Sequence, residues 1–415
     1  MAKTIVGKTS KTRRGQSIFR RVLAISFVIL AFGYQFHVGW FYLGGKNGFG
    51  DFGYVLERIP CISNDWASLY GPRTDEACSG YIYGSSLLIL LDMLGLSLTN
   101  LVPISYGLAT SLVLVYMWTF LKQNFNLAQH GLAIALLFSP PIILLIERMN
   151  VDVIVFLCVY LAIFLPRKIS KWASLLLVAL SALFKFYTFP LLVIMLRKVQ
   201  GKLRIYLLPV VISTLVIILI DLSRINGLPW DARNMFGNAI WGEYLLYVLK
   251  GPQTHANFAL SSLLGIAILL FVNTILRQIH IDIQLKSAAS DRDQKLFVYC
   301  LILYLTCYFS GLSVDYRLVF LLFAYLIFEN MFSLNVIGLA IVRVGVLLIF
   351  YLSYNTEKLQ PLGDIAQMVV LIILVRGLSL LLGVTARDIF DKSFVVARVI
   401  FARITRNRKE HYQSS

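Results

Sequence analysis

Long uninterrupted apolar runs constrain this chain more than any other feature. A membrane-spanning helix needs about 20 mostly apolar residues, and such runs recur from residue 22 to residue 383. Only 14% of the residues are charged, whereas a soluble domain carries about 25%. A soluble enzyme, a disordered protein and a coiled coil are therefore excluded. The runs do not alternate over about 10 residues, which also excludes a transmembrane β-barrel.

The runs predict an all-α, polytopic transmembrane bundle with about eleven to thirteen passes. The expected helices cover residues 22–43, 81–96, 101–121, 129–146, 151–166, 172–184, 187–198, 203–221, 258–276, 295–312, 316–332, 336–352 and 365–383. They form one domain, residues 22–383, between basic tails at 1–21 and 384–415. Residues 44–80 and 222–257 are the expected first and second external loops, the first with short amphipathic helices.

Charge placement predicts the topology. The first tail holds seven cations and no acid, and the last tail holds seven cations and three acids. By the positive-inside rule, both termini lie in the cytoplasm and the protein is a multi-pass protein of the cytoplasmic membrane, in contact with membrane lipids. The 44–80 loop, with three cations and five acids, is then external. No basic module interleaved with aromatic residues is present, so we expect no nucleic-acid partner.

Two basic loops, 166–171 and 197–204, both belong inside, although only about 25 residues separate them. Two half-helices that meet at Lys185, ahead of Pro190, satisfy both loops. Interrupted helices at membrane depth are tolerated where they line a protein-enclosed or wet cavity. The side of Arg148 stays open: a full pass of 81–96 puts it inside, and a partial pass, which Asp92 favours, puts it outside.

Ionisable residues near or within apolar runs are expected to be functional. Asp51 follows four glycines at the outer end of the first run and is either a general base for an incoming hydroxyl or a helix N-cap. Arg148 offers a bidentate phosphate ligand, or it lies in an ordinary loop. Lys185 faces an anionic ligand or snorkels to the interface. Arg317 reaches the same anion, or pairs with Asp315 at a helix start.

Three further features are open to two interpretations each. Tyr81 and Tyr83 lie at the outer end of a run, where they form an aromatic belt or stack on a sugar. Cys61 and Cys78 share the first external loop and are either disulfide-bonded, as an oxidising compartment allows, or two free thiols. No Cys/His spacing matches a zinc site.

The order of these motifs resembles a known family. Along the chain they are Asp51 in the first external loop, Tyr81-Ile82-Tyr83, Ser139-Pro140-Pro141, Arg148-x-Asn150-x-Asp152, Lys185-x-x-x-x-Pro190 and Asp315-Tyr316-Arg317. The pattern, over about residues 20–330, resembles the GT-C superfamily of integral-membrane glycosyltransferases. It is most similar to glycosyltransferase family 87, the polyprenol-phosphate-mannose-dependent mannosyltransferases.

The resemblance implies the GT-C fold and an inverting transfer of a sugar, mannose in the family, from a polyprenyl-phosphate donor to a hydroxyl of a glycolipid or lipid-linked glycan. The active site would face the periplasm or the cell exterior. Asp51 would be the base, and Lys185 with Arg148 or Arg317 would hold the donor phosphate. The implied substrate-binding residues are Asn150, Asp152, Tyr81, Tyr83 and Asp315. The first loop lacks an Asp-x-Asp motif, so we expect neither a metal nor another cofactor.

One departure leaves the sugar open: Tyr83-Gly84-Ser85-Ser86 stands where the family commonly has a proline-rich segment. Two other classes compete with the glycosyltransferase. A lipid-linked glycan polymerase of the O-antigen type would share the topology and a basic external site. A transporter or flippase would need coupling charges on a central path and an internal repeat, and the sequence displays neither.

Overall fold

A computed structural model describes residues 26, 49–64, 84–123, 125–165, 170–199, 201–224, 235–236, 258–286, 290–309, 313–314, 317–352 and 360–383. In its first part the helices are α2 (Gly50–Glu57), α3 (Cys61–Asn64), α4 (Ser85–Met93), η1 (Leu98–Asn100), α5 (Leu101–Lys122), α6 (Leu127–Leu137), α7 (Pro140–Arg148), α8 (Asp152–Phe164), α9 (Ser170–Phe184), η2 (Phe186–Thr188), α10 (Phe189–Lys198) and α11 (Lys202–Arg224). The expected 22–43 helix, apart from residue 26, lies outside the described residues.

The second part holds the helices α13 (Phe258–Gln278), α14 (Asp291–Phe309), α15 (Leu318–Met331), α16 (Val336–Leu352) and α17 (Gln360–Leu382). Four short strands interrupt them: β1 (Met235–Phe236), β2 (Ile283–Leu285), β3 (Ser313–Val314) and β4 (Phe332–Leu334). β1 pairs antiparallel with β3, and β2 pairs antiparallel with β4. The fold is therefore helical, as predicted, with two small ladders that the prediction missed.

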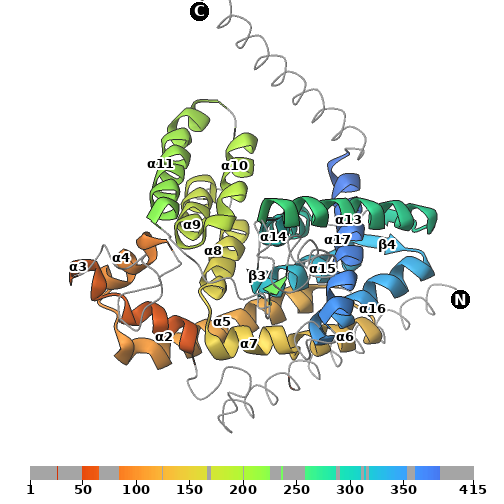
Figure 1. The fold of residues 1–415 in the computed structure, drawn as a ribbon, viewed down its shortest axis with the longest axis horizontal. Coiled ribbons are helices and arrows are strands. Elements are labelled where there is room, and N and C mark those ends of the chain that lie inside the picture. Colours follow the sequence, from red (N-terminus) through yellow and green to blue (C-terminus); the bar gives the residue numbers. More distant parts are fainter. Residues whose placement is uncertain are drawn as a thin grey trace, which may run out of the picture.

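Helices α8 to α11 pack as one group and α14 to α17 as another (Figure 1). Contacts of α14 with α8 and η2 join the two groups. Nearly every side chain of α15 is buried, so α15 is the central helix of the second group. Large apolar side chains on α5 and α11 remain exposed, which is the surface expected of helices in contact with lipid.

Among the residues that the structure describes, three helices are long and apolar enough to cross a membrane: Leu98–Phe120, Arg204–Asp221 and Leu362–Leu382. The bent pair α6–α7 makes a fourth if it counts as one span. Six shorter apolar helices account for other predicted runs. The expected eleven to thirteen full passes are thus not reached by helix length in the described residues. For example, α4 has nine residues and is about 14 Å long, half of a hydrocarbon core of about 30 Å.

The predicted break between half-helices is present. α9 ends at Phe184 and α10 begins at Phe189, with the short η2 turn between them. Lys185 is extended, with φ −141° and ψ 111°. A second interruption follows Ser139, where prolines at the start of α7 accompany a 43° bend from α6. Since proline lacks an N–H and suits the first turn of a helix, these prolines explain why the predicted 129–146 helix is two helices.

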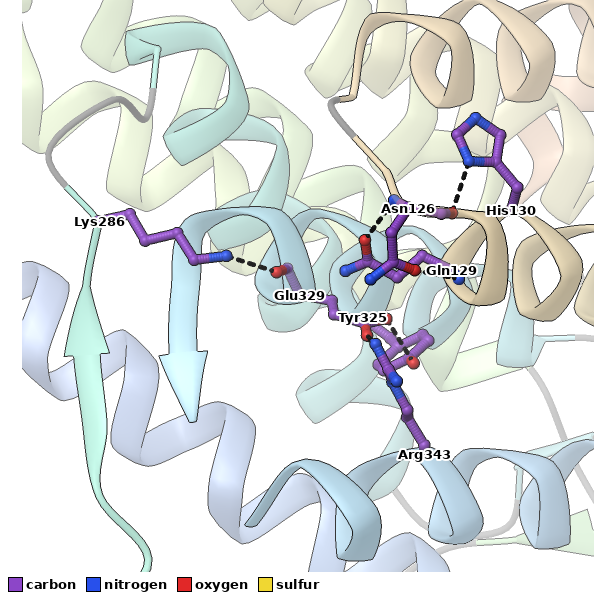
Figure 2. A network of polar contacts seen from close by, with 7 residues as sticks. All are labelled: Asn126, Gln129, His130, Lys286, Tyr325, Glu329 and Arg343. Atoms are coloured by element: carbon purple, nitrogen blue, oxygen red, sulfur yellow. Dashed lines mark hydrogen bonds and ion pairs between the residues drawn. The ribbon is translucent and has the colours of Figure 1, made fainter. Parts of the chain in front are cut away.

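A buried ion pair lies near the C-terminal end of α15 (Figure 2). Arg343 Nε of α16 donates to Glu329 Oε1 at 2.6 Å, and Tyr325 Oη donates to Glu329 Oε2 at 2.7 Å. Lys286 Nζ, just after β2, donates to the backbone oxygen of Glu329 at 3.2 Å. These bonds hold β2 and α16 against α15. Sequence analysis missed the pair because its members lie on separate helices within apolar runs.

The other residues drawn in Figure 2 form the start of α6. Asn126 and Gln129 make a reciprocal capping box, with bonds of 2.8 and 2.9 Å. His130 Nδ1 lies 2.7 Å from the backbone oxygen of Asn126. The two capping-box bonds satisfy the backbone N–H groups of Asn126 and Gln129 at the helix start.

Candidate functional site

Asp51 lies in the first turn of α2, and a strained residue sets its position. Phe49, the residue before the helix, has φ 62°, in the left-handed region that a bulky side chain rarely adopts. The backbone N–H of Phe49 donates to the backbone oxygen of Glu147 at 2.6 Å. The start of α2 is thereby fixed to the end of α7, where the Arg148 element lies.

Arg148 and Asn150 both hold the Asp51 carboxylate. Arg148 Nε and Nη2 lie 2.8 and 2.7 Å from Asp51 Oδ1. Asn150 Nδ2 donates to Asp51 Oδ2 at 2.6 Å. The Asp51 side chain is 11% exposed and that of Arg148 is 45% exposed. Each carboxylate oxygen has two lone pairs, so these bonds orient the carboxylate and leave it able to accept a further hydrogen bond.

The turn between α7 and α8 brings Asn150 to the Asp51 carboxylate and to the backbone N–H of Asp152. Met149 has φ 45°, and among the described residues Phe49 and Met149 are the two non-glycine positions with positive φ. Asn150 Oδ1 accepts the backbone N–H of Asp152 at 3.0 Å, while its Nδ2 bonds Asp51. Left-handed non-glycine residues cost about 1–3 kcal/mol each and cluster at functional sites. Both of these flank the Asp51 contact.

Asp152, at the start of α8, is fully buried and holds two cations. Lys185 Nζ lies 3.5 Å from Asp152 Oδ1, and Arg317 Nε lies 3.4 Å from Asp152 Oδ2. Tyr187 Oη donates to Asp152 Oδ1 at 2.6 Å. The Arg317 guanidinium carbon also lies 5.2 Å from the centre of the Tyr187 ring, a cation–π distance. The cations come from the α9–η2 junction and from the residue before α15.

Counted over the described residues alone, the site carries a net positive charge. Three cations, Arg148, Lys185 and Arg317, accompany two carboxylates, Asp51 and Asp152; with all five ionised, three positive and two negative charges leave +1. Arg148 pairs with Asp51, whereas Arg317 shares Asp152 with Lys185. Of the two partners considered for Lys185, Arg317 is therefore the one beside it. Within the described part of the chain, no group of three or more His, Cys, Asp or Glu residues is arranged to hold a metal ion.

The structure thus brings together six residues that four separate sequence motifs predicted as a site: Asp51, Arg148, Asn150, Asp152, Lys185 and Arg317. Tyr81, Tyr83 and Asp315 lie outside the described residues, as does Cys78. Cys61 is disulfide-bonded, and Cys158, Cys300 and Cys307 are free. The strand β1 lies in the predicted second external loop. It pairs with β3, whose residues Ser313 and Val314 precede Arg317 by four and three positions.

Sequence analysis missed the role of Tyr187. It stands two residues after Lys185 within an aromatic run, and an aromatic residue in an apolar run is most often part of the core. In the structure its side chain is buried, and a buried Tyr hydroxyl needs a hydrogen-bond partner, but the sequence itself does not reveal that burial. The interpretation of Asp152 as a substrate ligand also changes: with 0% exposure, its carboxylate contacts Lys185, Arg317 and Tyr187.

Comparison of the chain with protein-family models, with curated proteins and with solved structures found no match in any of the three.

Gly84 fits α4 against the end of α9, next to Lys185. Its N–H donates to the backbone oxygen of Phe184 at 3.2 Å. A Cβ at this position would lie 1.6 Å from the backbone oxygen of Leu183. Asp221 of α11 also holds the start of α4, because its Oδ2 accepts hydrogen bonds from both the backbone N–H and the hydroxyl of Ser85 at 3.0 Å. Only a glycine lets the start of α4 come this close to the end of α9. This contact fixes the backbone next to Lys185.

We expect Gly84→Ala to destabilise the protein and to displace Lys185. Because the clash is with backbone, relief requires α4 or the end of α9 to move, at a cost of about 1–3 kcal/mol, as for overpacking. Thermal unfolding in detergent measures the loss, and binding of a phosphate-bearing lipid measures the effect on Lys185. Gly107→Ala is the matched control, because its Cβ would meet nothing within 4 Å. Equal unfolding temperatures for the two variants would contradict the predicted clash.

Proposed function

We propose that the protein is an inverting glycosyltransferase that moves a sugar from a polyprenyl-phosphate donor to a hydroxyl of a glycolipid or lipid-linked glycan. The observation that carries the proposal is the contact network Asp51–Asn150–Asp152. It joins one partly exposed carboxylate to two cations, Lys185 and Arg317, that lie on a buried carboxylate. A base beside an anion-binding pair is the minimum set of groups for this reaction.

Asp51 is the proposed general base. A sugar hydroxyl is a weak nucleophile, and a positioned carboxylate that removes its proton contributes about 10²–10⁴-fold to the rate. Arg148 and Asn150 fix the carboxylate and leave one lone pair, on Oδ2, to accept a proton. Preorganised groups of this kind need no rearrangement in the transition state. The Asp51 side chain keeps 11% exposure beside a half-exposed Arg148, so the carboxylate is not fully enclosed.

Lys185 and Arg317 are the proposed ligands of the donor phosphate. A polyprenyl-phosphate sugar is a phosphodiester with a single negative charge, which the net charge of +1 at the site complements. When the bond from the anomeric carbon to the phosphate oxygen breaks, its electron pair goes to that oxygen, and the leaving phosphate gains negative charge. Nearby cations stabilise this developing charge more than the ground state, which lowers the barrier.

The step balances in one displacement. The acceptor oxygen forms a bond to the anomeric carbon, its proton goes to Asp51, and polyprenyl phosphate leaves with the bonding electron pair. Attack from the face opposite the leaving group inverts the anomeric configuration. Asp51 and the Lys185–Arg317 pair contact different ends of the network, with Asn150 between them. That separation suits a base and a leaving-group site on opposite sides of one sugar.

The test is a membrane-fraction assay with a panel of labelled polyprenyl-phosphate sugars and lipid-linked acceptors. We expect one sugar to be added per acceptor, with the anomeric configuration inverted. A ladder of products would instead identify a glycan polymerase. Uptake of substrate into liposomes without any transfer would identify a transporter or flippase. Either outcome would overturn the proposal.

A further inference from the structure

Asp152 is neither the proposed base nor a proposed phosphate ligand, and its buried contacts indicate another role. Lys185 and Arg317 both approach a single carboxylate, at 3.5 and 3.4 Å. Asp152 is 0% exposed, so its own contacts are with protein groups. Two cations held close together in a poorly solvated site repel each other. A carboxylate between them offsets that repulsion while no donor is bound.

The position of Tyr187 decides how strongly Asp152 holds Lys185. Its hydroxyl donates to Asp152 Oδ1 at 2.6 Å, the same oxygen that Lys185 approaches. A separation of 3.5 Å for Lys185 is longer than the 2.7–2.9 Å typical of an ammonium–carboxylate hydrogen bond. By donating to Oδ1 the hydroxyl disperses part of the negative charge on that oxygen, which weakens its attraction for Lys185, and Lys185 lies at the longer distance. The Tyr187 ring also lies beside the Arg317 guanidinium.

We propose that Asp152 and Tyr187 form a buried positioning pair that sets the anion affinity of Lys185 and Arg317: Asp152 restrains the two cations, and the Tyr187 hydroxyl weakens that restraint on Lys185. Neither residue touches the donor. This inference rests on the proposed function only for the identity of the anion, a phosphate monoester or diester on a lipid. The restraint itself follows from contacts among the protein's own side chains.

The proposal predicts opposite shifts for two variants. In Tyr187→Phe the ring remains and Oδ1 loses its closest donor, so Lys185 moves in toward Asp152 and is less available to a phosphate. We expect the Kd for a short-chain polyprenyl phosphate to rise about tenfold, near the lower limit for losing a hydrogen bond to a charged group. In Asp152→Asn the restraining charge is gone, the site gains positive charge, and the Kd falls by about threefold or more.

Binding is measured on purified full-length protein with polyprenyl phosphate as the probe, so it does not depend on transfer. The matched control is Tyr116→Phe, because Tyr116 is also buried and its hydroxyl donates to the backbone oxygen of Ala133 at 2.7 Å; its Kd stays at the wild-type value. Where transfer is detected, both Asp152→Asn and Tyr187→Phe lower kcat, and the KM for the acceptor is unchanged in both.

If the Kd for polyprenyl phosphate shifts in the same direction in both variants, the proposal is overturned, because a merely structural role weakens binding in each. A rise in the KM for the acceptor in both variants would also overturn the proposal. If Asp152→Asn fails to fold, Tyr187→Phe alone decides, because a Kd within twofold of wild type rules out the role of its hydroxyl. Absence of transfer by the wild-type protein, with opposite Kd shifts retained, would refute the glycosyltransferase while the positioning pair stands.

Discussion

Asp51→Asn is expected to lower kcat for sugar transfer by roughly 10³-fold, within the range for loss of a general base, while the protein still binds polyprenyl phosphate. The carboxamide has nearly the same shape as the carboxylate and still accepts a hydrogen bond from Arg148, but it cannot take the acceptor proton. Initial rates with labelled donor, together with the Kd for polyprenyl phosphate, separate lost chemistry from lost binding.

Two comparisons make the Asp51 prediction specific. The carboxamide NH₂ of the variant would face Asn150 Nδ2, which donates to Asp51 Oδ2 in the wild type. Asp51→Ala avoids that opposition of two donors and should be equally inactive. Asp291→Asn is the control, because Asp291 is an exposed acid paired with Lys295 at 2.7 Å. Transfer at the wild-type rate by Asp51→Asn would show that another group is the base.

Lys185→Met is expected to raise the Kd for polyprenyl phosphate by about 100-fold and to lower kcat by about 10²–10³-fold, the effect of removing one group that stabilises developing charge. The methionine fills a similar volume without charge. Asp152 then keeps Arg317 and Tyr187 but loses one of its two cations, so we also expect a loss of stability toward the 3–5 kcal/mol found when a buried ion pair is broken. Binding and thermal unfolding measure the two effects.

The control for this variant is Lys295→Met, which removes an exposed lysine from an ion pair within a single helix. Exposed pairs of this kind contribute about 0.3–0.5 kcal/mol, so its unfolding temperature and its Kd should stay close to those of wild type. A Lys185→Met protein that folds and binds polyprenyl phosphate as tightly as wild type would remove Lys185 from the phosphate site and leave Arg317 as its only candidate ligand.

Helix positions were largely predictable because apolar runs and prolines act locally. The half-helix break at Lys185 followed from two basic loops too close together for two full spans. The bend at Ser139 was marked by its prolines, although the sequence interpretation ran the helix straight through. Within the described residues, fewer helices are long enough to span a membrane than the apolar runs predict. Run length does not indicate where a helix stops short, as α4 does at Met93.

The site was predictable in its members and not in its contacts. Asp51, Arg148, Lys185 and Arg317 each stood out because charge near an apolar run is costly. Which of them pair could not be predicted, because 97 positions separate Asp51 from Arg148 and 165 separate Asp152 from Arg317. Tyr187 carried no local signal that distinguished it from a core residue. Glu329 and Arg343 lie within expected helices, where charge is costly, but nothing in the sequence indicated that they pair.

Composition and the positions of the charges alone determined that this chain is helical and membrane-embedded. They also marked the ionisable groups that needed an explanation. Both follow from the sequence because hydrophobic runs and helix-breaking residues are properties of neighbouring residues. Only the tertiary structure decided that Arg148 orients Asp51, that Arg317 joins Lys185, and that Asp152 is enclosed by protein. Those choices depend on distances of about 3 Å between groups far apart in sequence, which packing of α2, α7, α8 and α15 sets.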